Sequence, residues 1–178
     1  MDQIKKLTLY YSKEKLALRI TELAKEISRS YNSREPILIG VLNGSFIFLA
    51  DLLRKLRISC ELDFIKVSSY SGAQSTGKVE LVEDMSVDIK NRHVILVEDI
   101  IDSGNTIQFL RKRLLSYGPK SFSIVALFKK KNNAKLDFPI DFIGFEVKEE
   151  FVVGFGLDLD QKYRHLDAIY TLNQNFKK

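Results

Sequence analysis

Three carboxylates beside a run of small polar residues are the chemically most suggestive feature of the chain. Glu98, Asp99 and Asp102 lead into the segment Ser103-Gly104-Asn105-Thr106. A loop of this composition before a helix offers backbone N–H groups to a phosphate. Carboxylates repel a phosphate group. Their presence beside the loop therefore favours a ligand that also carries ribose hydroxyls or a bridging Mg²⁺, which the carboxylates would hold.

A strand and a helix must position this loop. The run from Val94 to Val97 is uninterrupted and apolar, with three β-branched residues, which predicts a strand buried on both faces of a parallel sheet. Over residues 107–114, apolar residues recur at helical spacing. The carboxyl end of a parallel strand faces the crevice in which open α/β sheets bind ligands. The acids are therefore predicted to lie at a ligand site.

Two considerations limit this interpretation. Side chains alternate along a strand, so at most one of Glu98 and Asp99 is expected to point fully into the site unless the chain turns there. The structural alternative is that Asp102 and Ser103 only cap the following helix, and that the two preceding acids form a solvated strand end. The length of the whole run counts against that alternative.

The run from Val97 to Thr106 resembles the phosphoribosyl-pyrophosphate motif of the phosphoribosyltransferases, in the form typical of hypoxanthine-guanine phosphoribosyltransferases. The resemblance implies that the loop from Asp102 to Thr106 cradles the 5′-phosphate of the sugar. It also implies that Glu98 and Asp99 hold the ribose hydroxyls, directly or through Mg²⁺. Asp102 would then act as acid and base at N7 of the purine.

A second loop of small residues, Asn43-Gly44-Ser45, follows the apolar run 36–42 and precedes another helical pattern. By itself this is an ordinary turn. Within the resemblance it matches the pyrophosphate loop of the family, with Leu42, Asn43 and Gly44 as binding residues and a non-proline cis peptide at Leu42–Asn43. Relatives commonly carry Lys or Arg where this chain has Asn43, so the loop keeps its backbone role without the side-chain charge.

The stretch 68–78 is long, small and polar, without apolar periodicity. A loop of this length in a compact domain is either functional or disordered. It resembles the mobile lid of the family, in which Ser69 and Tyr70 close over the substrates. Such a lid excludes water, which would otherwise hydrolyse a ribosyl cation-like centre.

The purine side of the site is predicted from two further segments. Lys129-Lys130-Lys131 follows an apolar run and is typical of a solvated basic turn. The family places here a lysine that donates to the 6-oxo group of the purine; Lys130 fits best, and Lys129 fits if the register slips by one.

The segment 151–158 has an aromatic residue before a glycine turn, an arrangement that can form a flat slot for a planar base. It resembles the base-binding motif of the family. The resemblance implies that Phe151 stacks on the purine, Val152 pairs with it through main-chain groups, and Asp158 binds a second Mg²⁺. Arg164 would contact pyrophosphate with a planar pair of donors.

Composition bounds the remaining possibilities. With 178 residues, 45% hydrophobic and 29% charged, the chain is expected to form a single domain. Its net charge is +5, and its basic residues are scattered apart from Lys129-Lys130-Lys131 and Lys177-Lys178, which argues against nucleic acid as a partner. Cys60 is the single cysteine, which fits a reducing cytoplasm, and two histidines make a structural zinc site improbable. No signal peptide or membrane-spanning run is predicted.

The predicted fold class is α/β, a parallel sheet flanked by helices (the type I phosphoribosyltransferase fold), with a small hood from residues 1–12 and 146–178. A stripe of Leu and Ile from Leu16 to Ile27, with Ser12 as its cap, predicts the first helix. The chain is interpreted as a Mg²⁺-dependent enzyme that transfers the phosphoribosyl group of phosphoribosyl pyrophosphate to N9 of hypoxanthine or guanine, as a homodimer or homotetramer.

Two alternatives remain open. One is an enzyme of the same class that prefers xanthine, since main-chain groups near Asp158 govern discrimination at the 2-position. The other is a non-catalytic regulator that senses phosphoribosyl pyrophosphate or nucleotides. The regulator would need an appended nucleic-acid-binding element, for which 178 residues leave no room.

Overall fold

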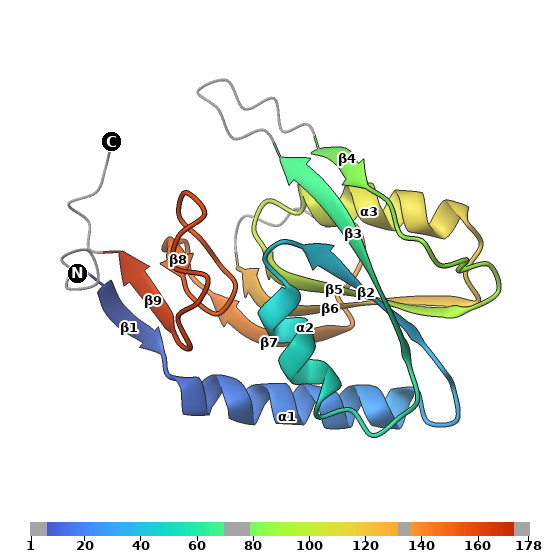
Figure 1. Ribbon diagram of the computed structural model, residues 1–178, viewed down its shortest axis with the longest axis horizontal. Coiled ribbons are helices and arrows are strands. Elements are labelled where there is room, and N and C mark those ends of the chain that lie inside the picture. The colour runs from blue at the N-terminus through green and yellow to red at the C-terminus, as the bar shows by residue number, and fades with distance from the viewer. Residues whose placement is uncertain (1–6, 70–78, 132–135, 173–178) are drawn as a thin grey trace.

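The computed structural model describes residues 7–69, 79–131 and 136–172. Its centre is a six-stranded sheet with the order β4-β3-β2-β5-β6-β7 (Figure 1). Four of the five strand pairs are parallel, and β4 runs antiparallel to β3. This confirms the predicted α/β class with a parallel sheet. The strands are β2 (Ile37–Leu42), β3 (Glu61–Ser69), β4 (Val79–Glu83), β5 (His93–Ile101), β6 (Ser121–Lys130) and β7 (Phe142–Val147).

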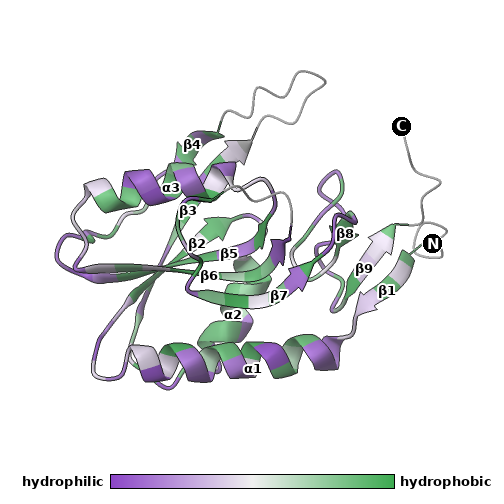
Figure 2. Ribbon diagram, turned by 180° about the vertical axis from the view of Figure 1, so that it is seen from behind, coloured by the Kyte–Doolittle hydropathy of each residue, from purple (hydrophilic) through white to green (hydrophobic). Residues whose placement is uncertain are grey.

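Three helices cover the two faces of this sheet. Helices α1 (Lys13–Ser30) and α2 (Phe46–Leu53) share one core cluster, and α3 (Asn105–Ser116) packs in a second. Successive residues of β5 alternate between the clusters: Ile95 joins the first and Leu96 the second. In Figure 2 strands β2 and β5 are largely hydrophobic, whereas α1 and α3 carry both colours, as expected of helices with one buried face.

Helix α1 forms as its sequence predicts. The Ser12 side chain accepts a hydrogen bond from the backbone N–H of Lys15 at 3.3 Å and so caps the first turn. The predicted stripe from Leu16 to Ile27 is fully buried. No helix within the described residues combines the length and apolarity that a membrane span needs.

A second, three-stranded sheet joins the two ends of the described chain. Its order is β1 (Leu7–Tyr11), β9 (Ile169–Leu172), β8 (Val152–Val153), with antiparallel pairing throughout. In Figure 1 it lies on the side toward which β2 and β6 point. This sheet is the predicted hood of N- and C-terminal segments. Strand β7 runs to Val147, so the main sheet includes the first two residues of the range expected for the hood.

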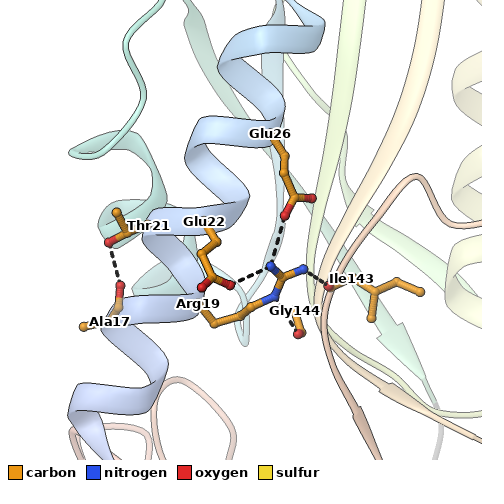
Figure 3. A network of polar contacts seen from close by, with 7 residues as sticks. All are labelled: Ala17, Arg19, Thr21, Glu22, Glu26, Ile143 and Gly144. Carbon is orange, nitrogen blue, oxygen red and sulfur yellow. Dashed lines mark hydrogen bonds and ion pairs between the residues drawn. The ribbon is translucent and has the colours of Figure 1, made fainter.

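Arg19 ties α1 to the edge strand β7 (Figure 3). Its guanidinium donates to the main-chain carbonyl of Gly144 at 2.9 Å and to that of Ile143 at 2.8 Å. Glu22 and Glu26 on α1 accept from the same group at 2.9 and 3.0 Å. An edge strand presents backbone groups that have no partner strand. The Arg19 guanidinium provides hydrogen-bond donors for two carbonyl groups of this edge strand.

Replacing Arg19 with methionine is expected to lower the free energy of unfolding by about 1.5–3 kcal/mol, the range for hydrogen bonds to a charged group. Methionine keeps the length and helix propensity of the side chain while removing every donor. Urea unfolding followed by circular dichroism measures the change. Lys25→Met, at an exposed position of the same helix, is the matched control and should change stability by less than about 0.5 kcal/mol. Equal effects of the two substitutions would contradict the proposed role of the network.

Candidate active site

The candidate site lies where the sheet order reverses. Strands β2 and β5 are neighbours in the sheet. After β2 the chain continues to β3 on one side of this pair, and after β5 it continues to β6 on the other side. Open α/β sheets bind ligands at the carboxyl ends of strands beside such a switch point. The loops that follow β2 and β5 are the two small-residue segments singled out from the sequence.

Glu98 and Asp99 were expected to follow the strand, but the structure places them inside it. They lie within β5, which continues to Ile101, and they are only 7% and 8% exposed. The alternative of a solvated strand end is wrong, because both side chains are buried.

Burial and mutual repulsion control the protonation of this pair. Removal from water, followed by the charge of Asp99, raises the pKa of Glu98 well above its ordinary value. Burial also raises the pKa of Asp99, against the opposing effects of its hydrogen bonds with Glu98 and the Ile100 N–H and of the Arg164 charge. The pair therefore holds a proton more tightly than an exposed carboxylate.

The carboxylate pair fits a magnesium ion. Glu98 Oε2 is buried and has no hydrogen-bond partner among the described residues. Mg²⁺ is commonly held by one or two carboxylates together with substrate phosphates, and a pair of hard oxygen donors matches that requirement. In the described part of the chain no three His, Cys, Asp or Glu residues form a metal cluster, so Asp158 does not join Glu98 and Asp99 in one ligand set.

Replacing Glu98 with glutamine is expected to stabilise the metal-free protein increasingly as pH rises from about 4.5 toward neutrality. A carboxyl with a raised pKa binds more protons in the folded than in the unfolded state, so its contribution to stability falls over this range. Glutamine carries no titrating proton. The difference in unfolding free energy between E98Q and the wild type, measured in EDTA between pH 4.5 and 8, should therefore increase with pH.

Magnesium provides the control for this prediction. A cation that binds the deprotonated pair should stabilise the wild type at neutral pH and leave E98Q nearly unchanged. A difference between the two proteins that stays constant with pH would contradict the buried, protonated pair.

The loop after β2 packs directly against Asp99. The peptide Leu42–Asn43 is cis, as the resemblance implied. A Cβ atom placed on Gly44 would lie 1.7 Å from Asp99 Oδ2, and one placed on Gly156 would lie 2.2 Å from the carbonyl oxygen of Gly44. Only glycine permits both approaches. The buried Ser45 closes the loop by donating from Oγ to the Val41 carbonyl at 2.7 Å.

Gly104, and not Asp102 or Ser103, is the N-cap of α3. It has φ +88°, in the left-handed region, and as a glycine it has no side chain with which to cap the helix. Ser103 Oγ instead accepts a 3.4 Å hydrogen bond from the Asn105 N–H. The N-cap position itself therefore carries no side chain. Backbone N–H groups at the start of a helix favour an anion, which suits the predicted phosphate loop.

Lys130 reaches Asp102 from the neighbouring strand. Its Nζ lies 2.8 Å from Asp102 Oδ2, with the lysine side chain 11% and the aspartate side chain 54% exposed. Lys131 points elsewhere, to Glu146 at 3.6 Å on the surface. Lys129 pairs in register with Ile101 and, among the described residues, forms no ion pair with the acids of β5. The geometry therefore favours Lys130 over Lys129 as the lysine of the site.

The hood contributes a network around Arg164. Its guanidinium pairs with Asp158 Oδ1 at 2.7 Å and donates to the Gly156 carbonyl at 2.7 Å. The other Asp158 oxygen accepts from the Gln161 N–H at 2.8 Å, and Gln161 Oε1 accepts from Arg164 at 3.1 Å. Through Gly156, this network lies against the Gly44 loop. Gln161 and Gly156 belong to this network and were not predicted from the sequence. The spacing of the two glycines in Gly154-Phe155-Gly156 could have indicated Gly156.

The residues predicted to bind the purine and to form the lid differ in exposure and in the element that carries them. Phe151 is 52% exposed, immediately before β8, and Val152 is buried within that strand. Ser69 ends β3, where it pairs with Val79 of β4. Tyr70 and the rest of the predicted lid lie outside the described residues.

Comparison with known proteins identifies the relatives of this chain. The family model described as "Phosphoribosyl transferase domain" matches residues 7–160. A hypoxanthine phosphoribosyltransferase from Escherichia coli K12 is 44% identical over 85% of this chain and 86% of its own length. A hypoxanthine-guanine phosphoribosyltransferase from Aquifex aeolicus is 43% identical over 94% and 96%. A crystal structure of a Bacillus anthracis hypoxanthine-guanine phosphoribosyltransferase superposes with TM-score 0.88 at 40% identity, covering 93% of this chain and 98% of that one.

Proposed function

Because the chain belongs to the phosphoribosyltransferase family, as an enzyme of the hypoxanthine(-guanine) kind that serves purine salvage, we propose that it transfers the 5-phosphoribosyl group from phosphoribosyl pyrophosphate to N9 of hypoxanthine or guanine. The products are IMP or GMP and pyrophosphate. The observation that carries this proposal is the Lys130–Asp102 pair, at 2.8 Å, which follows the buried carboxylates Glu98 and Asp99 of β5 along the chain.

Different parts of the site bind different groups of phosphoribosyl pyrophosphate. The loop from Asp102 to Thr106 holds the 5′-phosphate at the start of α3, and Glu98 and Asp99 hold the ribose hydroxyls. The Leu42–Gly44 loop and Arg164 bind the pyrophosphate. This arrangement fixes C1 of the ribose next to the purine, and positioning of this kind supplies much of the rate in a bimolecular transfer.

The purine is bound from the hood and from β6. Phe151 stacks on the base, Val152 pairs with it through main-chain groups, and Lys130 donates to its 6-oxo group. As N9 attacks C1 and the bond to pyrophosphate breaks, Asp102 takes or gives the proton at N7. In the free protein Lys130 keeps Asp102 paired and oriented toward the site; purine binding would replace that contact.

Mg²⁺ is the proposed cofactor, held by Glu98 and Asp99 and, for a second ion, by Asp158. When bound, the metal supplies charge stabilisation to the departing pyrophosphate. Asp158 would exchange its ion pair with Arg164 for the metal, which frees the guanidinium for pyrophosphate. We also propose that the enzyme works as a homodimer or homotetramer in the cytoplasm, without nucleic acid or membrane as partner.

A base panel tests the proposed function. The purified protein is mixed with phosphoribosyl pyrophosphate, Mg²⁺ and one of hypoxanthine, guanine, xanthine or adenine, and nucleotide formation is followed by absorbance. We expect turnover with hypoxanthine and guanine and little with adenine. Turnover with xanthine alone would favour the xanthine-preferring alternative, and tight phosphoribosyl pyrophosphate binding with no turnover on any base would favour the regulator.

A further inference from the structure

A polar cavity opens at the end of the sheet opposite the candidate active site. Its volume is about 1110 Å³, and its walls are the segments 32–35, 57–61, 91–93 and 120–121. These segments lead into the amino ends of β2, β3, β5 and β6, on the right of Figure 1. No residue of the candidate active site lines this cavity, so its chemistry is independent of the purine and pyrophosphate sites.

The cavity carries more positive than negative charge. Arg34, Arg57, Arg92 and Lys120 line it, against Glu35 and Glu61. The ion pair of Arg92 with Glu61 occupies one cation and one carboxylate. Within the part of the chain that the structure describes, no ion pair engages the other three cations. Their charges are therefore available to a bound anion.

The cations of the cavity are not explained by a stabilising interaction with the negative ends of the helix dipoles. Helices α1, α2 and α3 all end near the cavity, and a cation in the last turn of a helix is stabilising there. Arg29 and Arg113 already occupy the last turns of α1 and α3. The unpaired cations lie beyond the helix ends at Ser30, Leu53 and Ser116, where the effect of the dipole has fallen off.

We propose that this cavity binds a compact anion through a phosphoryl group, either inorganic phosphate or the phosphate of a small ester. The guanidinium groups of Arg34 and Arg57 offer planar pairs of donors, and Lys120 adds a point charge. Of the lining residues that the structure describes, Ile58 alone is apolar. The walls therefore recognise the phosphoryl group and provide no aromatic platform for a base.

His93 is a built-in reporter for this anion site. It lines the cavity, and its Nδ1 lies 2.7 Å from Ser121 Oγ. Burial, then the charges of Lys120 and Arg34, lowers the pKa of His93. An anion bound between those two cations would offset their charges and raise the pKa. The only other histidine, His165, follows Arg164 in the hood, so the two rings report on opposite ends of the molecule.

The test is an NMR titration of the two histidine rings in the full-length protein. Inorganic phosphate and ribose 5-phosphate are added separately, with sodium chloride at matched ionic strength as the reference. We expect phosphate to shift the His93 resonances saturably and to raise the pKa of His93 by about one unit, while chloride does neither. If the His93 shift saturates with inorganic phosphate and not with ribose 5-phosphate, the free ion is the ligand. If it saturates with both compounds, the site also accepts phosphate esters.

Matched variants separate the site from general screening. The double variant R34Q/K120Q should lose the saturable response at His93, whereas K112Q, at an exposed position on α3, should keep it. A His165 resonance at the same chemical shift as in the wild type shows that the double variant is folded. Equal His93 shifts with phosphate and chloride, no response at His93, or an undiminished response in R34Q/K120Q would each overturn the proposal.

Discussion

Replacing Asp102 with asparagine is expected to reduce kcat by about 10²- to 10⁴-fold, the usual contribution of a general acid or base. Asparagine has the shape of aspartate and can still accept a hydrogen bond from Lys130 Nζ, which now lies 2.8 Å from Asp102 Oδ2. It cannot accept a proton from N7 of the purine. Steady-state kinetics with hypoxanthine gives kcat, and calorimetric titration gives the affinity for phosphoribosyl pyrophosphate, which should change little.

The separation of these two quantities makes the prediction specific. A merely structural role for Asp102 would weaken phosphoribosyl pyrophosphate binding and turnover together, because the phosphate loop starts at this residue. Asp88→Asn, at an exposed position remote from the loop, is the matched control and should leave both unchanged. An unaltered kcat in D102N would rule out the proton-transfer role.

Local patterns in the sequence predicted the elements that carry the site. The Ser12 cap, the buried stripe of α1 and the apolar run of β5 all depend on residues close in sequence, so periodicity and capping chemistry were sufficient to locate them. The order of motifs along the chain then indicated the family, and with it the cis peptide at Leu42–Asn43.

Contacts between distant segments could not be predicted in this way. Glu98 and Asp99 could be taken from the sequence for a solvated strand end, yet both side chains are buried, and the distant loop at Gly44 packs against Asp99. Arg19 carries no sequence signal for its bonds to the carbonyls of β7. Whether Lys129 or Lys130 faces the site depends on the pairing of β6 with its neighbours, which sequence spacing leaves open by one residue.

Replacing Gly44 with alanine is expected to lower kcat/KM by about 10²-fold or more and the free energy of unfolding by about 1–3 kcal/mol. The added methyl would lie 1.7 Å from Asp99 Oδ2 and 2.5 Å from Asp99 Cγ, so the carboxylate or the loop must move. A displacement of about 1 Å at a catalytic position costs activity on this scale. Kinetics with phosphoribosyl pyrophosphate and urea unfolding measure the two effects.

A double-mutant cycle with Asp99→Ala identifies the cause. If the loss of stability in G44A comes from the clash with the Asp99 carboxylate, G44A should cost much less in the D99A background, since that substitution vacates the space. The cycle is read on unfolding free energy, because D99A by itself removes a proposed ligand of ribose and metal. Contacting residues commonly show interaction energies of about 0.5–3 kcal/mol, whereas independent sites add. Strict additivity would mean that Gly44 is needed for another reason, such as the approach of Gly156 to its carbonyl oxygen.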